Sequence, residues 1–438
     1  MSLLTQDQAR EILAKVMSYS KAGECEANLN GNSGGNIRYA RNTVTTSGMQ
    51  TDMTLVVQSS YGKRTGTATI NEFDDVALQK VVQRSQELAK LAPENPEYVE
   101  FLEPQKYLAA NAYFDSTAAV TPEYRTQAAA NSIQPCRAKQ LIAAGFFQDG
   151  AGFQAMMNSK GLFAYHRQTS VNFSATVRTP DGTGSGYVTR DQNDLAKMDT
   201  AAASQVAVEK AEGSRQPLAI EPGKYTVILE PAASIELLQN MLFNMDARQT
   251  DEGRTFLAKP GGGTKLGEKM VDERVTIYSD PTHPEVPAAT WNGDGRPQEK
   301  VIWIEKGVVK NLAYSRFWAQ KKGVKAVPFP NNGIMAGGEA SLEDMIRSTT
   351  RGVLVSRTWY IRTVDPQTLL YTGLTRDGLF YIENGRIKHA IKNFRFNESP
   401  VIMLNNLEAL GKPVRINGNL IPPMKIRDFT FTSISDAV

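Results

Sequence analysis

Histidine and cysteine are the residues from which metal sites and nucleophilic catalysis are most often built, and this sequence has few of them. Its three histidines, His166, His283 and His389, lie far apart, so no HExxH, HxxxH or HxH pair can form a local metal site. Two cysteines, Cys25 and Cys136, are too few for a multi-cysteine zinc or iron–sulfur site. No serine–histidine–aspartate triad can be assembled from the sequence alone. We expect both thiols to be buried and inert, His166 to lie in a hairpin strand, and His283 to lie in a turn.

Three glycine-containing segments are the other candidates for chemistry. Gly182-Thr-Gly-Ser-Gly lacks the third glycine of a GxGxxG phosphate loop, and Gly261-Gly-Gly-Thr-Lys lacks the G-K-[ST] ending of a P-loop. Asn292-Gly-Asp-Gly has oxygen donors without the spacing of a calcium-binding loop. We interpret all three as turns or loops.

Composition places the chain among ordinary globular proteins. It has 438 residues, of which 41% are hydrophobic and 22% charged, with a formal net charge of +3. These values exclude a disordered chain, and the small net charge predicts no nucleic-acid or membrane partner. No basic segment followed by an apolar one marks a signal peptide, and no apolar run is long enough to span a bilayer. We therefore expect a cytoplasmic protein, although a sequence trimmed of its signal would look the same.

The first half must position its side chains on a sheet flanked by helices. Thr5 and Gln8 form a capping-box pattern before a helical apolar stripe that stops at Gly23, and Asp74 begins a second helix that ends before Pro93. Alternating segments between these helices predict an antiparallel meander. Its strands are expected at 25–30, 37–46, 53–59 and 64–70, with turns at 32–35 and 61–62.

The rest of the first half is predicted to be another helix–sheet unit. After an irregular connector at 93–122, a helix begins at Thr121-Pro122-Glu123 and is expected to break near Pro135. Strands are expected at 146–159, 162–178 and 187–190, and an alanine-rich helix at 194–212.

A domain boundary is expected at Glu212-Gly-Ser-Arg-Gln-Pro, which is polar and interrupts the preceding helix. It divides the chain into an amino-terminal domain at 1–215 and a carboxyl-terminal domain at 216–438. The predicted fold class is α+β, with a helix-flanked antiparallel sheet in the first domain and a mixed, strand-rich second domain.

The second domain opens with a strand at 225–229 and an amphipathic helix at 234–247. The apolar face of this helix is expected to hold Ile235, Leu238, Leu242 and Met245. Its polar face holds Glu236, Asn240 and Asn244 at i, i+4 spacing.

Several short segments, in order along nearly the whole chain, resemble the TldD/PmbA family, historically called modulators of DNA gyrase and understood as metalloproteases. In the first half they are Arg38-Tyr-Ala-Arg-Asn-Thr-Val-Thr-Thr-Ser-Gly, Gly62-Lys-Arg-Thr-Gly-Thr-Ala and Asn158-Ser-Lys-Gly. In the second half they are Gly253-Arg-Thr-Phe-Leu, Leu266-Gly-Glu-Lys, Val275-Thr-Ile-Tyr-Ser-Asp-Pro, Gly307-Val-Val-Lys-Asn-Leu, Gly352-Val-Leu-Val and Phe380-Tyr-Ile-Glu-Asn-Gly-Arg-Ile.

The catalytic branch of that family carries an HExxxH helix directly after a strand and a proline, with a later cysteine as the third zinc ligand. Here the proline is Pro231 and the helix reads Leu237-Leu-Gln-Asn-Met-Leu-Phe-Asn. The histidine positions fall on Gln239 and Asn244, and the glutamate position falls on Asn240. No histidine lies between residues 166 and 283, and no cysteine follows residue 136.

Carboxamides at these positions change the chemistry that the resemblance implies. They bind zinc poorly and cannot take a proton from a metal-bound water. The resemblance therefore points to the non-catalytic PmbA-like branch, with no catalytic residue and no metal or cofactor in this chain. Zinc is expected only in a catalytic TldD-like partner. Gln239, Asn240 and Asn244 are then either a solvated polar face or a degenerate pocket that contacts a peptide.

The expected function is that of a structural or substrate-binding subunit of a metalloprotease that processes unfolded peptides. The chain would be inactive alone and would form a homodimer or a heterodimer with a TldD-like catalytic subunit. Two alternatives stay open: a self-sufficient hydrolase with a non-standard metal site or a nucleophile such as Cys25, and a homodimeric peptide-binding module. The sequence names no substrate and shows no link to DNA gyrase.

Overall fold

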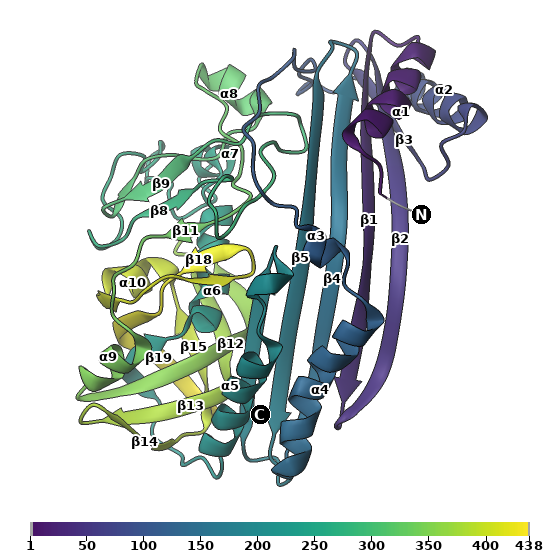
Figure 1. Cartoon of the computed structure of the whole chain (residues 1–438). Helices are drawn as coiled ribbons and strands as arrows, with labels where there is room; N and C mark the ends of the chain where they lie inside the picture. Colours follow the sequence, from purple (N-terminus) through teal and green to yellow (C-terminus); the bar gives the residue numbers. More distant parts are fainter. Residues whose placement is uncertain (1–2, 437–438) are drawn as a thin grey trace.

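The computed structural model describes residues 3–436, which form two sheet-based halves (Figure 1). The helical segments of the first half are α1 (Gln6–Tyr19), α2 (Asp75–Leu91), α3 (Asp115–Ala118), α4 (Pro122–Ala138), a 3-10 turn η1 (Leu195–Lys197) and α5 (Thr200–Gly213). Its strands are β1 (Glu24–Ala40), β2 (Thr43–Tyr61), β3 (Arg64–Ile70), β4 (Ile142–Asn158), β5 (Phe163–Arg178) and β6 (Ser185–Gln192).

The first half is one antiparallel sheet in the order β3-β2-β1-β4-β5-β6. Side chains alternate between its faces, and the odd-numbered residues of β1, β4 and β5 point toward the helices. Leu29 and Phe153 pack in the core that includes α1 and α2, while Phe147 and Phe173 pack in the core that includes α4 and α5. The prediction of a helix-flanked antiparallel sheet is confirmed.

The expected turn at residues 32–35 is wrong, because β1 runs unbroken through it. The glycines there allow close approach of neighbouring groups instead of a change of direction. A Cβ atom at Gly34 would lie 2.2 Å from the carbonyl oxygen of Asp149, and one at Gly35 would lie 2.2 Å from Arg125 Cζ. The meander therefore has three strands, not four.

The helix starts that depend on local caps are confirmed. Thr5 and Gln8 make both hydrogen bonds of the capping box, and the Asp74 side chain accepts from the backbone N–H of Ala77. Two other expectations need correction. α4 continues through Pro135 to Ala138, since a proline so near the end removes a single hydrogen bond. α5 begins at Thr200, because Asp194 caps only the η1 turn.

The second half is the strand-rich part that the sequence predicted. Its helices are α6 (Pro231–Phe243), α7 (Ala247–Asp251), α8 (Arg316–Lys322), α9 (Leu342–Arg347) and α10 (Pro400–Asn405). Its strands are β7 (Gly223–Leu229), β8 (Ile277–Ser279), β9 (Val301–Glu305), β10 (Val308–Val309), β11 (Ile334–Met335), β12 (Arg351–Asp365), β13 (Leu370–Glu383), β14 (Arg386–Ala390), β15 (Asn393–Glu398), β16 (Leu407–Leu410), β17 (Val414–Ile416), β18 (Asn419–Ile421) and β19 (Met424–Ser435).

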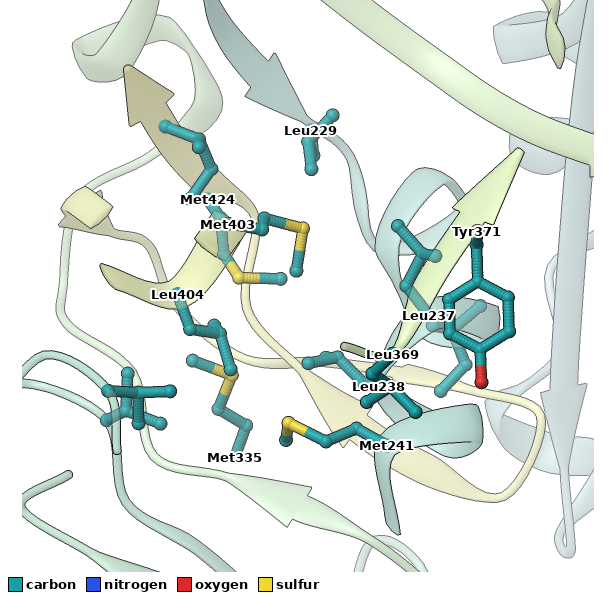
Figure 2. Close-up of a cluster of buried hydrophobic side chains, with 14 of the residues drawn as sticks. Leu229, Leu237, Leu238, Met241, Met335, Leu369, Tyr371, Met403, Leu404 and Met424 are labelled. Atoms are coloured by element: carbon teal, nitrogen blue, oxygen red, sulfur yellow. The ribbon is translucent and has the colours of Figure 1, made fainter. Parts of the chain in front are cut away.

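Two sheets build this half. The larger follows the order β12-β7-β19-β15-β13-β14, with β16 paired to β19 as its seventh strand. An additional pairing of β12 with β13 joins five of its strands into a ring. The smaller sheet follows the order β10-β9-β8-β11-β18-β17. α6 packs between them, with Leu237, Leu238 and Met241 buried beside Met335 and Met403 (Figure 2).

The expected bounds of this helix, 234–247, are displaced. α6 starts at Pro231, a residue suited to the first helical position, and ends at Phe243. The Asp246 side chain accepts from the backbone N–H of Gln249 and begins the separate helix α7. Met245 and Ala247 therefore lie outside α6.

Buried polar contacts join the two halves. Ser185 Oγ donates to Asp377 Oδ1 at 2.7 Å, and Arg415 Nε donates to Asp191 Oδ2 at 2.9 Å. Within residues 3–436, no helix is both long and apolar enough to cross a membrane.

Candidate functional site

The side chains of Gln239 and Asn240 on α6, and of Asn244 directly after it, point in two directions. Gln239 and Phe243 are one turn apart and both line a cavity beside the helix. Asn240 and Asn244 are also one turn apart, on the side where Asn244 Nδ2 lies 3.5 Å from the Tyr371 hydroxyl and 2.8 Å from the Asn240 carbonyl oxygen. The structure therefore does not bring the three predicted positions together in one pocket.

The cavity beside Gln239 has a volume of about 230 Å³. Phe243 is 69% exposed, and its ring lies 6.0 Å from that of Phe329, so two aromatic rings line the opening. The remaining wall is rich in carboxamides. The lining residues are Gln239, Leu242, Phe243, Phe329, Pro330, Asn331, Asn332, Gly333, Asn417 and Asn419.

Three of these carboxamides, Asn331, Asn332 and Asn419, are structural, because each makes hydrogen bonds to the backbone. Asn332 Nδ2 donates to the carbonyl oxygens of Asp280 and Val286 at 2.7 Å, and Asn419 Oδ1 accepts from the Gly333 N–H at 2.7 Å. Gln239, by contrast, makes no side-chain hydrogen bond to any residue in the described range 3–436. Its amide is free to bind a ligand in the cavity.

The donors around this cavity do not fit zinc. Zinc in proteins is held by imidazole, thiolate or carboxylate, and none of the lining residues has such a group. The acid on α6, Glu236, lies on another side of the helix, and burial raises the pKa of its carboxyl. Among residues 3–436 no three His, Cys, Asp or Glu side chains are grouped closely enough to hold a metal ion.

The other sequence candidates are scattered. His166 lies on β5, His283 follows the turn at Asp280, and His389 lies on β14 with its ring 5.4 Å from that of Tyr381. Cys25 and Cys136 are fully buried, and burial raises the pKa of both thiols, that of Cys136 to about 11. Neither thiol is placed to act as a nucleophile.

The glycine-rich segments lie outside the cavity. Gly182 is in the tight connection between β5 and β6, and Gly261–Gly263 form a loop in which an added Cβ would meet nothing within 4 Å. Asn292-Gly-Asp-Gly forms a loop whose Gly295 lies beside Met156 of β4, and Tyr107 Oη, from the connector between α2 and α3, donates to the carbonyl oxygen of Gly295 at 2.7 Å. None of them builds a phosphate site.

Sequence reasoning missed Asn331, Asn417 and Asn419 because each looks like a turn residue. Pro330-Asn-Asn-Gly and Asn417-Gly are ordinary turn signals, and nothing in their spacing relates them to Gln239. The tertiary fold alone brings these amides to α6.

Comparison with known proteins assigns most of the chain to two domain families. Residues 117–215 match the PmbA/TldA metallopeptidase central domain, and residues 222–433 match the PmbA/TldA metallopeptidase C-terminal domain. An uncharacterized protein of Methanocaldococcus jannaschii is 24% identical over 372 residues, which is 80% of this chain and 83% of that protein. A metalloprotease of Methanothermobacter thermautotrophicus is 21% identical over 301 residues, 62% of each chain.

Solved structures with the same fold cover almost all of the chain. TldE from Thermococcus kodakarensis superposes with a TM-score of 0.87 at 19% identity, over 97% of this chain and 100% of that one. A putative modulator of DNA gyrase from Thermotoga maritima gives a TM-score of 0.87 at 16% identity, with the same coverage.

Proposed function

Because the chain belongs to the PmbA/TldD metallopeptidase family, we propose that it is a non-catalytic, substrate-binding subunit of a metalloprotease that cleaves unfolded peptides. It would bind the peptide and leave hydrolysis to a zinc-bearing, TldD-like partner chain. The assembly would be a heterodimer of two related chains.

The observation that carries this proposal is the chemistry of the cavity at Gln239. The helix that follows β7 and begins at Pro231 presents a free carboxamide, surrounded by further carboxamides and two aromatic rings. The free Gln239 amide can donate to and accept from a peptide main chain, and the cavity wall supplies no group that can act as a general base. The site therefore suits binding without hydrolysis.

The test compares this chain alone with the chain mixed with the TldD-like protein of the same organism. Zinc per chain is measured by elemental analysis, and cleavage of a labelled unfolded peptide is measured with and without EDTA. We expect near-zero zinc and no cleavage for this chain alone, and EDTA-sensitive cleavage for the mixture. Near-stoichiometric zinc, or EDTA-sensitive cleavage by the chain alone, would overturn the proposal.

A matched pair of variants connects the cavity to the activity of the mixture. Gln239→Lys places a cation in the cavity and is expected to raise the KM of the mixture for the peptide at least fivefold. Gln83→Lys, at an exposed position of α2, is expected to leave KM unchanged. Equal KM values for both variants would show that the Gln239 cavity does not contribute to peptide binding.

A further inference from the structure

The face of the first sheet that points away from its helices carries a row of uncharged polar side chains. They lie among the even-numbered residues in the middle of β1, β4 and β5. Asn30 on β1 pairs with Gln154 on β4, and Gln154 pairs with His166 on β5. Asn28 and Gln168 extend this row along the neighbouring strand positions, and the second half of the chain packs against it.

A cavity of about 630 Å³ lies between this face and the 288–293 loop of the second half. None of its lining residues is charged. They are Asn28, Asn30, Val56, Gln154, Gln168, Ala288, Ala289, Trp291, Asn292, Gly293 and Asn331. The next residue on this face of β1 is Glu26, which accepts from Asn28 Nδ2 at 3.1 Å and does not line the cavity.

Asn331 lines both this cavity and the cavity at Gln239, so the two hollows meet at one side chain. Its Nδ2 atom donates to the carbonyl oxygens of Ala289 at 2.8 Å and Trp291 at 3.3 Å. It therefore also holds the 288–293 loop in place as a wall of the sheet cavity.

Three buried polar atoms beside the sheet cavity have no hydrogen-bond partner within residues 3–436. They are His166 Nε2, Trp291 Nε1 and Asn292 Oδ1. His166 is only 7% exposed and Trp291 only 4%. Buried polar atoms in proteins nearly always have hydrogen-bond partners. A small movement of the 288–293 loop and a bound polar ligand could supply the partners that these three atoms lack.

We propose that the two cavities form one binding path for an extended peptide whose side chains are uncharged. The path runs from Gln239 past Asn331 to Asn30, Gln154 and Gln168 on the sheet. This inference rests on the proposed function, and it adds the substrate class and the second half of the site.

The carboxamides that line the path carry the same hydrogen-bonding groups as the main chain of a peptide. A carboxamide offers two N–H donors and one acceptor oxygen, the same kinds of group as the main chain. Asn28 and Asn30, two positions apart on β1, repeat at the interval at which an extended peptide repeats its own N–H and C=O groups on one side. A charged peptide side chain would lose water in this cavity and find no counter-charge among the lining residues, so the path selects against it.

The experiment measures binding of fluorescein-labelled ten-residue peptides to the full chain by fluorescence anisotropy. One peptide contains only Gly, Ser, Asn and Thr, and two others carry Asp or Lys at alternate positions. We expect the uncharged peptide to bind at least tenfold more tightly than either charged one. Gln154→Leu and Gln168→Leu should each weaken its binding at least fivefold.

Gln148→Leu is the matched control, since Gln148 lies on the same strand and face as Gln154 and lines neither cavity. Gln154→Lys should reverse the preference and favour the Asp-containing peptide. Thermal unfolding of each variant checks that it folds; the substituted side chains are exposed.

The outcomes separate the two proposals. If Gln239→Lys weakens binding while Gln154→Leu, Gln168→Leu and Gln154→Lys do not, the sheet cavity is excluded and the proposed function stands. If charged peptides bind as tightly as the uncharged one, the substrate class is wrong. If no peptide binds the wild-type chain, both the path and the substrate-binding role are overturned.

Discussion

Arg125 and Asp149 form a buried, bidentate ion pair between α4 and β4. Arg125 Nε lies 2.6 Å from Asp149 Oδ1, and Nη2 lies 2.9 Å from Oδ2. The two side chains are 3% and 5% exposed. Gly35 on β1 leaves the space that the guanidinium occupies. The pair thus fixes α4 on the middle of the sheet.

Removal of one partner should be costly, because it leaves the other charge buried without compensation. Arg125→Met is expected to lower the free energy of unfolding by about 3–5 kcal/mol. The double variant Arg125→Met, Asp149→Leu should recover much of that loss. Urea denaturation measures both. Arg84→Met removes an exposed ion pair with an N–O distance of 3.6 Å and serves as the control. Its free energy of unfolding should stay within about 0.5 kcal/mol of wild type. An equal loss in Arg125→Met and Arg84→Met would contradict the prediction.

Gly35→Ala should destabilise the chain by about 1–3 kcal/mol, since the new methyl group would overlap the Arg125 guanidinium. Gly48→Ala on β2 is the comparison, because an added Cβ there meets nothing within 4 Å. Thermal or urea unfolding should show a clear loss for residue 35 and none for residue 48. Similar stabilities for the two variants would mean that the sheet and α4 are less closely packed than described.

Glu398 should make stability depend on pH. Burial raises the pKa of its carboxyl to about 7, although it accepts from the backbone N–H groups of Ser399 and Thr430. The folded state therefore keeps a proton on Glu398 that the unfolded state loses near pH 4.5. The contribution of Glu398 to the free energy of unfolding is thus fully present below pH 4.5 and is lost as the pH rises to about 7. The loss should be about 3 kcal/mol.

Glu398→Gln should flatten that part of the curve, as measured by the free energy of unfolding at several pH values between 4 and 8. Some slope will remain, because burial also raises the pKa of Glu26 to about 7. An unchanged slope in Glu398→Gln would show that Glu398 titrates normally.

Asp74→Ala should cost about 1 kcal/mol through loss of the cap on α2. Asp75→Ala, one residue later, removes only an exposed contact with Lys15 and should cost less than half as much. The comparison by chemical denaturation separates capping from general loss of negative charge.

The features that could be predicted from the sequence are those that depend on residues close together in the chain. The caps at Thr5 and Asp74 act within three residues, so their patterns identify real helix starts. The glycines at 34–35 were misread because the groups that require them, Asp149 and Arg125, are far away in the sequence. The candidate site is non-local in the same way. The position of Gln239 on a helix was predictable, whereas its meeting with Asn331 and Asn419 depends on how β11 and β18 pair.

The strand ring of the second half has a consequence for synthesis on the ribosome. β7, the first strand of that half, pairs with β19, which begins at Met424. Until β19 has left the exit tunnel, β7 lacks this neighbour and the ring cannot close, while the first sheet draws only on residues up to 192. The first sheet can therefore form while the second half is still incomplete, and a chain that stops before residue 424 would expose unpaired, aggregation-prone strand edges.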